Sequence, residues 1–201
     1  GESLVIIGPN GAGKTVLLKA LLGVIPHEGK IIWKDNIKIG YTPQRFLADK
    51  NLPLNLEEFF KFKKINDSQI KEVLSQVGIS DPQILKQKIG VISVGLLQRV
   101  LIAWSLIDNP EILIFDEPTA NIDIEGEETI YNLLDKIKKE RGLAVILVSH
   151  DLNVVYKLAD KVLCLNKKGI CFGTPEESVN PEILKKLYGG EIKFYQHGHE
   201  H

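Results

Sequence analysis

The chain has 201 residues, of which 44% are hydrophobic, and its formal net charge is −1. This composition predicts a globular protein of one domain with a subdomain inserted into it. It excludes a broad electrostatic grip on nucleic acid, because such binding needs a strongly basic surface. No apolar run approaches the ~20 residues that cross a bilayer, and no signal peptide opens the sequence. We therefore expect any association with a membrane to go through a partner.

The first predicted elements are a strand, a glycine-rich loop and a helix. Residues 2–8 (ESLVIIG) form a short β-branched strand, and residues 15–23 (TVLLKALLG) have the apolar spacing of a helix. Gly23 can cap this helix. Residues 30–33 (KIIW) and 38–41 (KIGY) are expected as two short strands on either side of the turn KDN.

Residues 46–108 are predicted to be all-helical, because no convincing strand pattern interrupts them. Three segments in this region have helical spacing: 55–65, 68–79 and 96–107. Asp67 or Ser68 can act as the N-cap of the second of these helices.

Strand character returns in three apolar segments after the helical region. They are 111–118 (EILIFDEP), 143–151 (LAVILVSHD) and 161–166 (KVLCLN), and a helix is predicted over 125–142 between the first two. An α/β core is therefore interrupted by a helical insert. The predicted core comprises residues 1–45 and 109–180, the insert residues 46–108, and a C-terminal extension residues 181–201.

Two cysteines, Cys164 and Cys171, flank residues 165–170 (LNKKGI), which have the composition of a hairpin turn. A disulfide between them is one interpretation. The interpretation that the sequence favours is two buried thiols in a reducing compartment, because disulfides are rare there.

Residues 8–15 (GPNGAGKT) match a phosphate-binding loop, in which a glycine and four further residues precede Gly-Lys-Thr. The loop consists of Gly8, Pro9, Asn10, Gly11, Ala12, Gly13, Lys14 and Thr15. Its glycines let backbone N–H groups turn around phosphate oxygens, and the next helix presents its positive N-terminus to the same anion. We expect Lys14 to reach the β- and γ-phosphates and the Thr15 hydroxyl to bind Mg²⁺. The alternative is a plain glycine turn.

Two adjacent acids end the apolar run ILIFDE (112–117). A buried strand should not end in neighbouring carboxylates unless they face a cation or solvent. We expect Asp116 to hold Mg²⁺ through water and Glu117 to polarise an attacking water molecule. The alternative is a solvated acidic turn. The presence of a phosphate-loop motif in the same chain disfavours this alternative.

Two further polar residues complete the candidate site. His150 follows a buried strand and, taken alone, is a loop or capping residue. The predicted strand order brings it to the sheet edge that holds the phosphate loop and Glu117, so we favour a role in sensing the γ-phosphate. Gln44 follows IGYTP as an isolated polar residue and is a second candidate for the site. The alternative interpretation is an ordinary surface glutamine.

In order along the chain, GPNGAGKT, Gln44, ISVGLLQR, ILIFDEPTANID and SHD resemble the ATP-binding subunit of an ABC transporter. The resemblance covers nearly the whole sequence. It implies a P-loop NTPase core with an inserted helical subdomain, and ATP and Mg²⁺ as cofactors. It also implies ATP hydrolysis with Glu117, His150 and Gln44 as catalytic groups. Mg²⁺ would be held by Thr15, Gln44 and Asp116.

Residues 92–99 (ISVGLLQR) occupy the family's signature position, normally close to Leu-Ser-Gly-Gly-Gln-x-Gln-Arg. The resemblance implies that two ATPase subunits join head to tail and that Ser93 and Gly95 contact the ATP on the other subunit's phosphate loop. Val94 replaces a glycine, and Leu96 replaces a residue that could complete a capping box with Ser93. We expect weaker contact across the dimer. The alternative is that both side chains simply pack and leave a catalytically slow subunit.

The family resemblance also implies partners. Gln44 would link the γ-phosphate side to a transmembrane permease, which docks on the helical insert near residues 47–55 (LADKNLPLN), and Asp123 would contact the second ATPase subunit. The protein would then lie at the cytoplasmic face of the membrane. In this family adenine stacks on an aromatic residue before the phosphate loop. Because the chain begins at Gly1 and contains no methionine, we expect that residue and the N-terminal strands upstream.

A narrower resemblance is to the ATPases of bacterial zinc-uptake importers, with manganese importers as close relatives. It lies in residues 39–44 (IGYTPQ), 52–60 (LPLNLEEFF) and 162–177 (VLCLNKKGICFGTPEE). It implies uptake of a divalent metal ion that a periplasmic or surface metal-binding protein delivers to the permease. His197, His199 and His201 alternate in the tail and are able to bind Zn²⁺ loosely. The alternative is a polar end or a remnant of expression design.

Three other functions are compatible with parts of the sequence. A P-loop kinase uses the same loop but has no reason for the SHD and DEPTANID segments. A soluble ABC protein of translation or DNA repair usually has two cassettes or long insertions, whereas this chain has one compact cassette. A silent or weakly active nucleotide-binding module is the third, and the altered signature makes it credible.

Overall fold

A six-stranded sheet forms the centre of the molecule, in a computed structural model that describes residues 1–44, 46, 49–119 and 122–189. The strand order is β2-β3-β4-β1-β5-β6. The strands are β1 (Ser3–Ile7), β2 (Ile39–Thr42), β3 (Ile112–Asp116), β4 (Ala144–Val148), β5 (Lys161–Asn166) and β6 (Lys168–Gly173). β1 to β5 pair in parallel, and β6 runs antiparallel to β5. The predicted α/β fold is confirmed.

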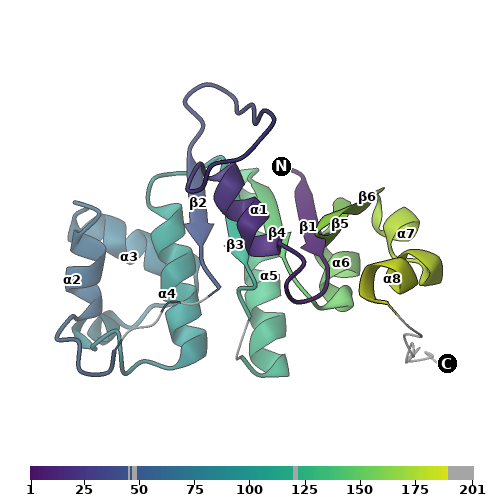
Figure 1. The fold of residues 1–201 in the computed structure, drawn as a ribbon. Helices are drawn as coiled ribbons and strands as arrows, with labels where there is room; N and C mark the ends of the chain where they lie inside the picture. Colours follow the sequence, from purple (N-terminus) through teal and green to yellow (C-terminus); the bar gives the residue numbers. More distant parts are fainter. Residues whose placement is uncertain (45, 47–48, 120–121, 190–201) are drawn as a thin grey trace.

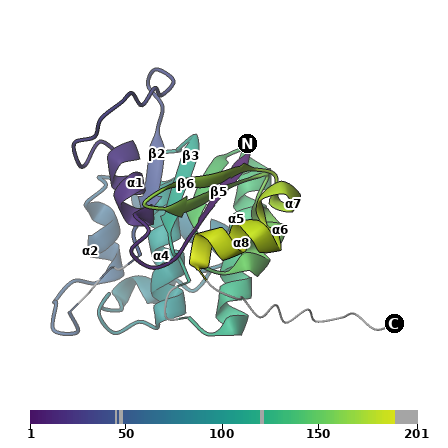
Figure 2. The same ribbon diagram turned by 45° about the vertical axis from the view of Figure 1, so that its right-hand side comes forward.

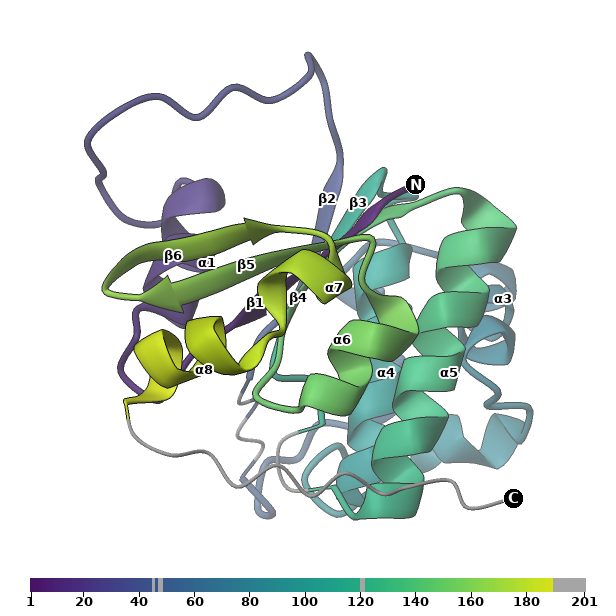
Figure 3. The same ribbon diagram turned by 90° about the vertical axis from the view of Figure 1, so that its right-hand side faces the viewer.

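Helices cover both faces of this sheet (Figures 1 and 3). They are α1 (Lys14–Leu21), α2 (Leu56–Lys61), α3 (Asp67–Gln76), α4 (Val94–Leu106), α5 (Ile124–Arg141), α6 (Leu152–Leu158), α7 (Pro175–Ser178) and α8 (Pro181–Tyr188). A 3₁₀ helix, η1 (Pro82–Lys86), was not predicted. The helical segments expected within 46–108 are confirmed as α2, α3 and α4, which lie together beside the β2 edge (Figure 1). Within the described residues, no helix combines the length and the apolar character that crossing a bilayer requires.

Side chains of the central strand β1 alternate between two apolar layers. Val5 and Ile7 belong to the layer that α5 and α6 cover, whereas Ile6 packs in the layer with Leu18 of α1. All of these side chains are fully buried. Burying one such side chain contributes roughly 1.5–3 kcal/mol, so both layers resist any shift of β1. The loop that follows β1 therefore starts from a fixed position.

The strand predicted at 30–33 is wrong, whereas the one predicted at 38–41 is confirmed as β2. Within the described part of the chain, residues 30–33 pair with no other strand, and the Ile32 side chain is 87% exposed. A strand needs a neighbour to satisfy its backbone N–H and C=O groups. Apolar β-branched composition alone was therefore a misleading signal at this position.

The N-cap predicted for the second inserted helix is also wrong by one or two residues. Asn66, and not Asp67 or Ser68, caps α3. Its side chain accepts a hydrogen bond from the Gln69 backbone N–H at 3.0 Å, and the Gln69 side chain accepts one from the Asn66 backbone at 3.0 Å. This reciprocal capping box satisfies two free N–H groups, where a cap at Asp67 or Ser68 offers one.

The hairpin predicted around residues 165–170 is confirmed as β5 and β6, but the prediction of two free thiols is wrong. Cys164 and Cys171 are directly opposite each other in the antiparallel register and are joined by a disulfide. Their Cα atoms lie 4.8 Å apart, within the range that disulfides require. Sequence spacing could not supply this register, because it depends on which residues form the turn.

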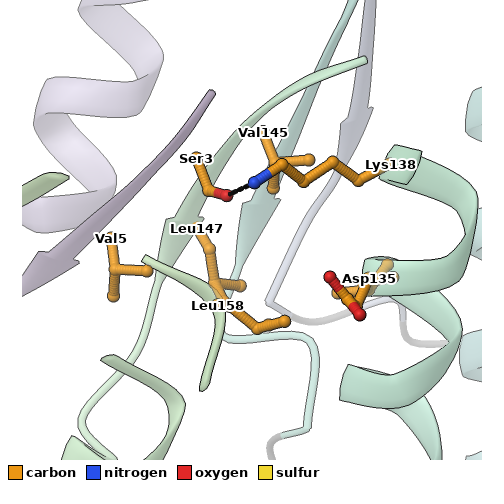
Figure 4. Close-up of a pocket in the computed structure, with 8 residues that line it drawn as sticks. Ser3, Val5, Asp135, Lys138, Val145, Leu147 and Leu158 are labelled. Carbon is orange, nitrogen blue, oxygen red and sulfur yellow. Dashed lines mark hydrogen bonds between the residues drawn. The ribbon is translucent and has the colours of Figure 1, made fainter. Parts of the chain in front are cut away.

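A polar contact anchors α5 to the start of β1 (Figure 4). Lys138 donates to the Ser3 hydroxyl and to the Asp160 carboxylate, which lies 2.7 Å from the Lys138 Nζ. The Lys138 contact and hydrogen bonds from Ser3 lower the pKa of the Asp160 carboxyl. The cavity beside this contact measures about 10 Å³, enough for at most one water molecule. It is a packing gap, and the candidate site must lie elsewhere.

Candidate nucleotide-binding site

The phosphate loop joins the end of β1 to the start of α1, at the edge of the sheet where the parallel strands end (Figures 1 and 2). Gly11 and Gly13 have left-handed φ angles of 76° and 98°, which side chains disfavour. α1 starts directly after, at Lys14. First-turn N–H groups of a helix have no intrahelical acceptor, so they are available to an anion. The strand–loop–helix arrangement that the motif requires is confirmed.

The tip of the β5–β6 hairpin supports this loop from behind. A Cβ atom on Gly8 would lie 1.9 Å from the carbonyl oxygen of Leu165, so the two backbones are in close contact. The backbone N–H of Lys167, which has a left-handed φ of 60°, donates to the Ala12 carbonyl at 2.8 Å. Sequence reasoning missed this support, for which the turn NKKG was the only available signal.

Gly8→Ala should lower the free energy of unfolding by about 2 kcal/mol, because the new methyl group must displace the backbone of Leu165. Chemical denaturation followed by circular dichroism measures the change. Gly169→Ala is the matched control, since a Cβ there meets no atom within 4 Å. Equal stability of the two variants would show that the loop and the hairpin are not in close contact.

Lys14 lies across the mouth of the phosphate loop. Its Nζ donates to the carbonyl oxygens of Gly8 at 2.8 Å and Pro9 at 3.2 Å, and the side chain is buried. The same Nζ is 3.6 Å from Glu117 Oε1. A buried ammonium group needs compensating partners, and here carbonyls and a carboxylate supply them. An anionic phosphate could compete for the same charge.

Glu117 is the point at which the predicted site residues meet. The Gln44 Nε2 donates to its Oε2 at 2.6 Å, and the His150 Nδ1 lies 4.0 Å from the same oxygen. With Lys14, the partners of Glu117 come from three separate segments of the chain. Glu117 has a left-handed φ of 49°, and its backbone N–H donates to the Val148 carbonyl at 3.1 Å. The structure thus brings together Lys14, Gln44, Glu117 and His150. The strand order predicts this for the phosphate loop, Glu117 and His150, whereas Gln44 was expected here only from the family resemblance.

Asp116 ends β3 next to Glu117, and its side chain is only 1% exposed. Neither of its carboxylate oxygens has a hydrogen-bond partner among the described residues. Burial, as the largest cause, raises the pKa of this carboxyl, and the facing Thr15 hydroxyl acts in the opposite direction. A buried carboxylate without partners is costly, and a cation removes that cost. Asp116 and Thr15 are therefore chemically suited to hold a metal ion.

The signature segment forms the start of α4. Ser93 is its N-cap and accepts from the Leu96 backbone N–H at 3.3 Å, which confirms the predicted cap. Val94 is 50% exposed, whereas Leu96 packs against the core, so only one of the two altered side chains packs. A Cβ on Gly95 would meet no atom within 4 Å. Among the described residues, no hydrogen bond or ion pair joins this segment to the phosphate loop.

Asp123 caps α5, accepting from the Gly126 backbone N–H at 3.0 Å. The histidines of the tail, His197, His199 and His201, lie outside the described residues. Within the described ranges, no group of three or more His, Cys, Asp or Glu side chains is arranged to hold a metal ion.

Residues 1–120 match the sequence family described as ABC transporter. The chain belongs to this family. Three curated relatives are named zinc import ATP-binding protein ZnuC. That of Magnetococcus marinus is 40% identical, covering 99% of this chain and 78% of the relative. Those of Pseudomonas entomophila and Yersinia pestis are each 38% identical, covering 100% of this chain and 79% and 81% of the relatives, respectively.

Two solved ABC structures have the same fold. A metal-chelate type ABC transporter in an inward-facing conformation gives a TM-score of 0.82 at 26% identity, covering 92% of this chain and 78% of that one. The cbiO1 protein of Clostridium perfringens, part of the complex cbiONQ, gives 0.74 at 26% identity, covering 92% of this chain and 82% of that one. As an ABC ATP-binding protein, this chain binds ATP and is an ATPase, and the predicted P-loop ABC fold is confirmed.

Proposed function

We propose that this chain is the ATPase subunit of an importer that couples ATP binding and hydrolysis to uptake of a divalent metal ion, zinc. The observation that carries the proposal is that relatives named for zinc import match 99–100% of the chain at 38–40% identity. The metal-chelate type transporter with a TM-score of 0.82 supports metal uptake as the wider class. Manganese is the alternative cargo.

Hydrolysis would take place around Glu117, which orients or deprotonates the attacking water. Lys14 and His150 stabilise the negative charge on the transferring phosphoryl group. Gln44 holds the Glu117 carboxylate and links the site to the permease. The support for these roles is geometric, since all three side chains lie within 4.0 Å of the Glu117 carboxylate. The phosphate loop, Gly8 to Thr15, binds the triphosphate through its N–H groups.

The residues of this site fit Mg²⁺. The partnerless carboxylate of Asp116 and the facing Thr15 hydroxyl would hold the ion, and Gln44 would contribute its side-chain oxygen. When bound with ATP, Mg²⁺ neutralises charge on the phosphate oxygens. Asp116 is held by strand β3, in which Leu113, Ile114 and Phe115 are also buried.

Two copies of the chain would join head to tail around two ATP molecules. Ser93 is exposed, and Gly95 leaves open space at the first turn of α4. Because only a short loop connects α4 to β3, the start of α4 lies on the side of the sheet where β3 ends. Ser93 and Gly95 are therefore available to phosphate bound on a second copy. Asp123 would contact that second copy.

The permease would dock on the helical subdomain, predicted as residues 46–108 and inserted into a core of residues 1–45 and 109–180. Leu52 and Phe62 give this subdomain exposed apolar surface. The subunit would lie peripherally at the cytoplasmic face of the membrane through the permease, and a periplasmic or surface protein would deliver the metal ion. A weakly active module is the second candidate, because Val94 adds a half-exposed side chain where a phosphate would approach.

Reconstitution with the permease in lipid vesicles tests the proposal. Vesicles that contain the permease and the full-length protein should accumulate zinc when Mg-ATP is supplied. The permease should also stimulate ATP hydrolysis. Glu117→Gln should abolish both activities. Uptake of Mn²⁺ without Zn²⁺ would reassign the metal ion, and very slow hydrolysis even with the permease would favour the weakly active module. Stimulated hydrolysis without transport of any divalent metal ion would contradict a role in metal uptake.

A further inference from the structure

Three buried hydroxyl groups lie behind the candidate catalytic residues. They belong to Thr119, Tyr131 and Ser149, each at most 4% exposed. Thr119 follows Glu117 by two residues, and Ser149 directly precedes His150. Tyr131 comes from a third element, α5, in the layer that packs against the sheet. No role in the chemistry has so far been given to any of these hydroxyls.

The Tyr131 hydroxyl is hydrogen-bonded to the loop that carries Glu117 and faces the loop that carries His150. Its Oη is 2.8 Å from the Thr119 Oγ1 in a buried hydrogen bond. The Ser149 hydroxyl also faces this phenol, and it accepts from the Asp151 backbone N–H at 3.0 Å. Burial raises the pKa of Tyr131, so the phenol is neutral and can both donate and accept.

The two loops need such a connection for different reasons. Glu117 has a left-handed φ of 49°, a conformation that costs a non-glycine residue free energy and persists only where neighbours hold it. His150 is 64% exposed, so its position depends largely on the backbone that carries it. The hydrogen bond from Glu117 N to Val148 O joins the loops at their base. Tyr131 holds the first of these loops at Thr119, two residues after Glu117.

We propose that Tyr131 is a positioning residue for ATP hydrolysis, whose hydroxyl holds the loop that carries Glu117 in place through Thr119. The proposal rests on the catalytic role proposed above for Glu117. A misplacement of a catalytic group by about 1 Å can cost up to 100-fold in rate, so this anchor has a measurable effect.

Tyr131→Phe tests this, because it removes the hydroxyl and leaves the buried ring. In the full-length protein with its permease, kcat should fall about tenfold while KM for ATP stays within about twofold. Tyr156→Phe, in which the hydroxyl lost is exposed and 3.4 Å from the Val179 carbonyl, should keep the parental rate. Parental kcat in Tyr131→Phe, or a loss of activity explained by a raised KM alone, would overturn the proposal.

Thr119→Val removes the other partner of the same hydrogen bond. It is the test to use if Tyr131→Phe folds poorly. Combined with Tyr131→Phe, it should cause little further loss of kcat, because both changes remove one hydrogen bond. Fully additive losses would contradict a shared connection. Glu117→Gln separates the two proposals: if it is inactive and Tyr131→Phe is not impaired, only the role of Tyr131 fails. If Glu117→Gln hydrolyses ATP normally, the catalytic assignment itself fails.

Discussion

Glu117→Gln should lower the rate of ATP hydrolysis by about 100-fold or more while ATP binding is retained. The amide keeps the size of the side chain and can still contact Gln44, but it cannot accept a proton from water. Lys14 and the phosphate-loop amides, which would bind the triphosphate, are unchanged. Phosphate release under saturating ATP measures the rate, and equilibrium titration with labelled ATP measures binding.

Glu111→Gln is the matched control for this variant. Glu111 directly precedes β3, at the end opposite Glu117, and pairs with Lys34 at 2.7 Å on the surface. Loss of this ion pair should leave ATP hydrolysis at the parental rate, because exposed ion pairs contribute little to stability. Parental hydrolysis in Glu117→Gln, with Glu111→Gln also normal, would show that another group activates the water.

Lys14→Met should weaken ATP binding by about 100-fold, because it removes the charge that would bind the terminal phosphates. The methionine side chain keeps most of the apolar stem, so the fold should be preserved. Among the described residues, Lys14 contacts Glu117 and otherwise bonds to backbone carbonyls, so its removal leaves few other side chains without partners. Titration with ATP in the full-length protein measures the change in Kd.

Lys19→Met controls for the loss of a positive charge on the same helix. Lys19 is exposed in the last turn of α1, whereas Lys14 is buried in its first turn. Its replacement should change the Kd by less than about twofold, since exposed charges are screened by salt. If both variants bind ATP equally well, Lys14 does not contact the phosphates, and the proposed orientation of the triphosphate is wrong.

The convergence at Glu117 could be predicted from sequence because it depends on strand order. Glu117 and His150 each follow an apolar parallel strand, and such strands end at one edge of a sheet. The phosphate loop follows a third strand at the same edge. Gln44 follows β2, the neighbour of β3, so it too lies beside Glu117. The strand pattern was sufficient for Glu117, His150 and the phosphate loop, whereas the role of Gln44 was expected only from the family resemblance.

The groups that support these residues could not be predicted. Tyr131 occupies an apolar position of α5, and its sequence pattern is that of an ordinary core residue. Its hydrogen bond to Thr119 depends on how α5 packs against the loop after β3. The contact of Lys167 with Ala12 likewise depends on the hairpin register, as does the pairing of Cys164 with Cys171. Long-range packing of this kind leaves no periodic signal in the sequence.

A crystal structure of full-length Glu117→Gln with ATP and Mg²⁺ tests most directly whether the terminal bond of ATP lies at the point where these side chains meet. The γ-phosphate should lie within hydrogen-bonding distance of the Lys14 Nζ and next to position 117, with the ion between Asp116, Thr15 and the phosphates. A triphosphate bound away from the loop of residues 8–15, or with its terminal phosphate directed away from position 117, would contradict the account.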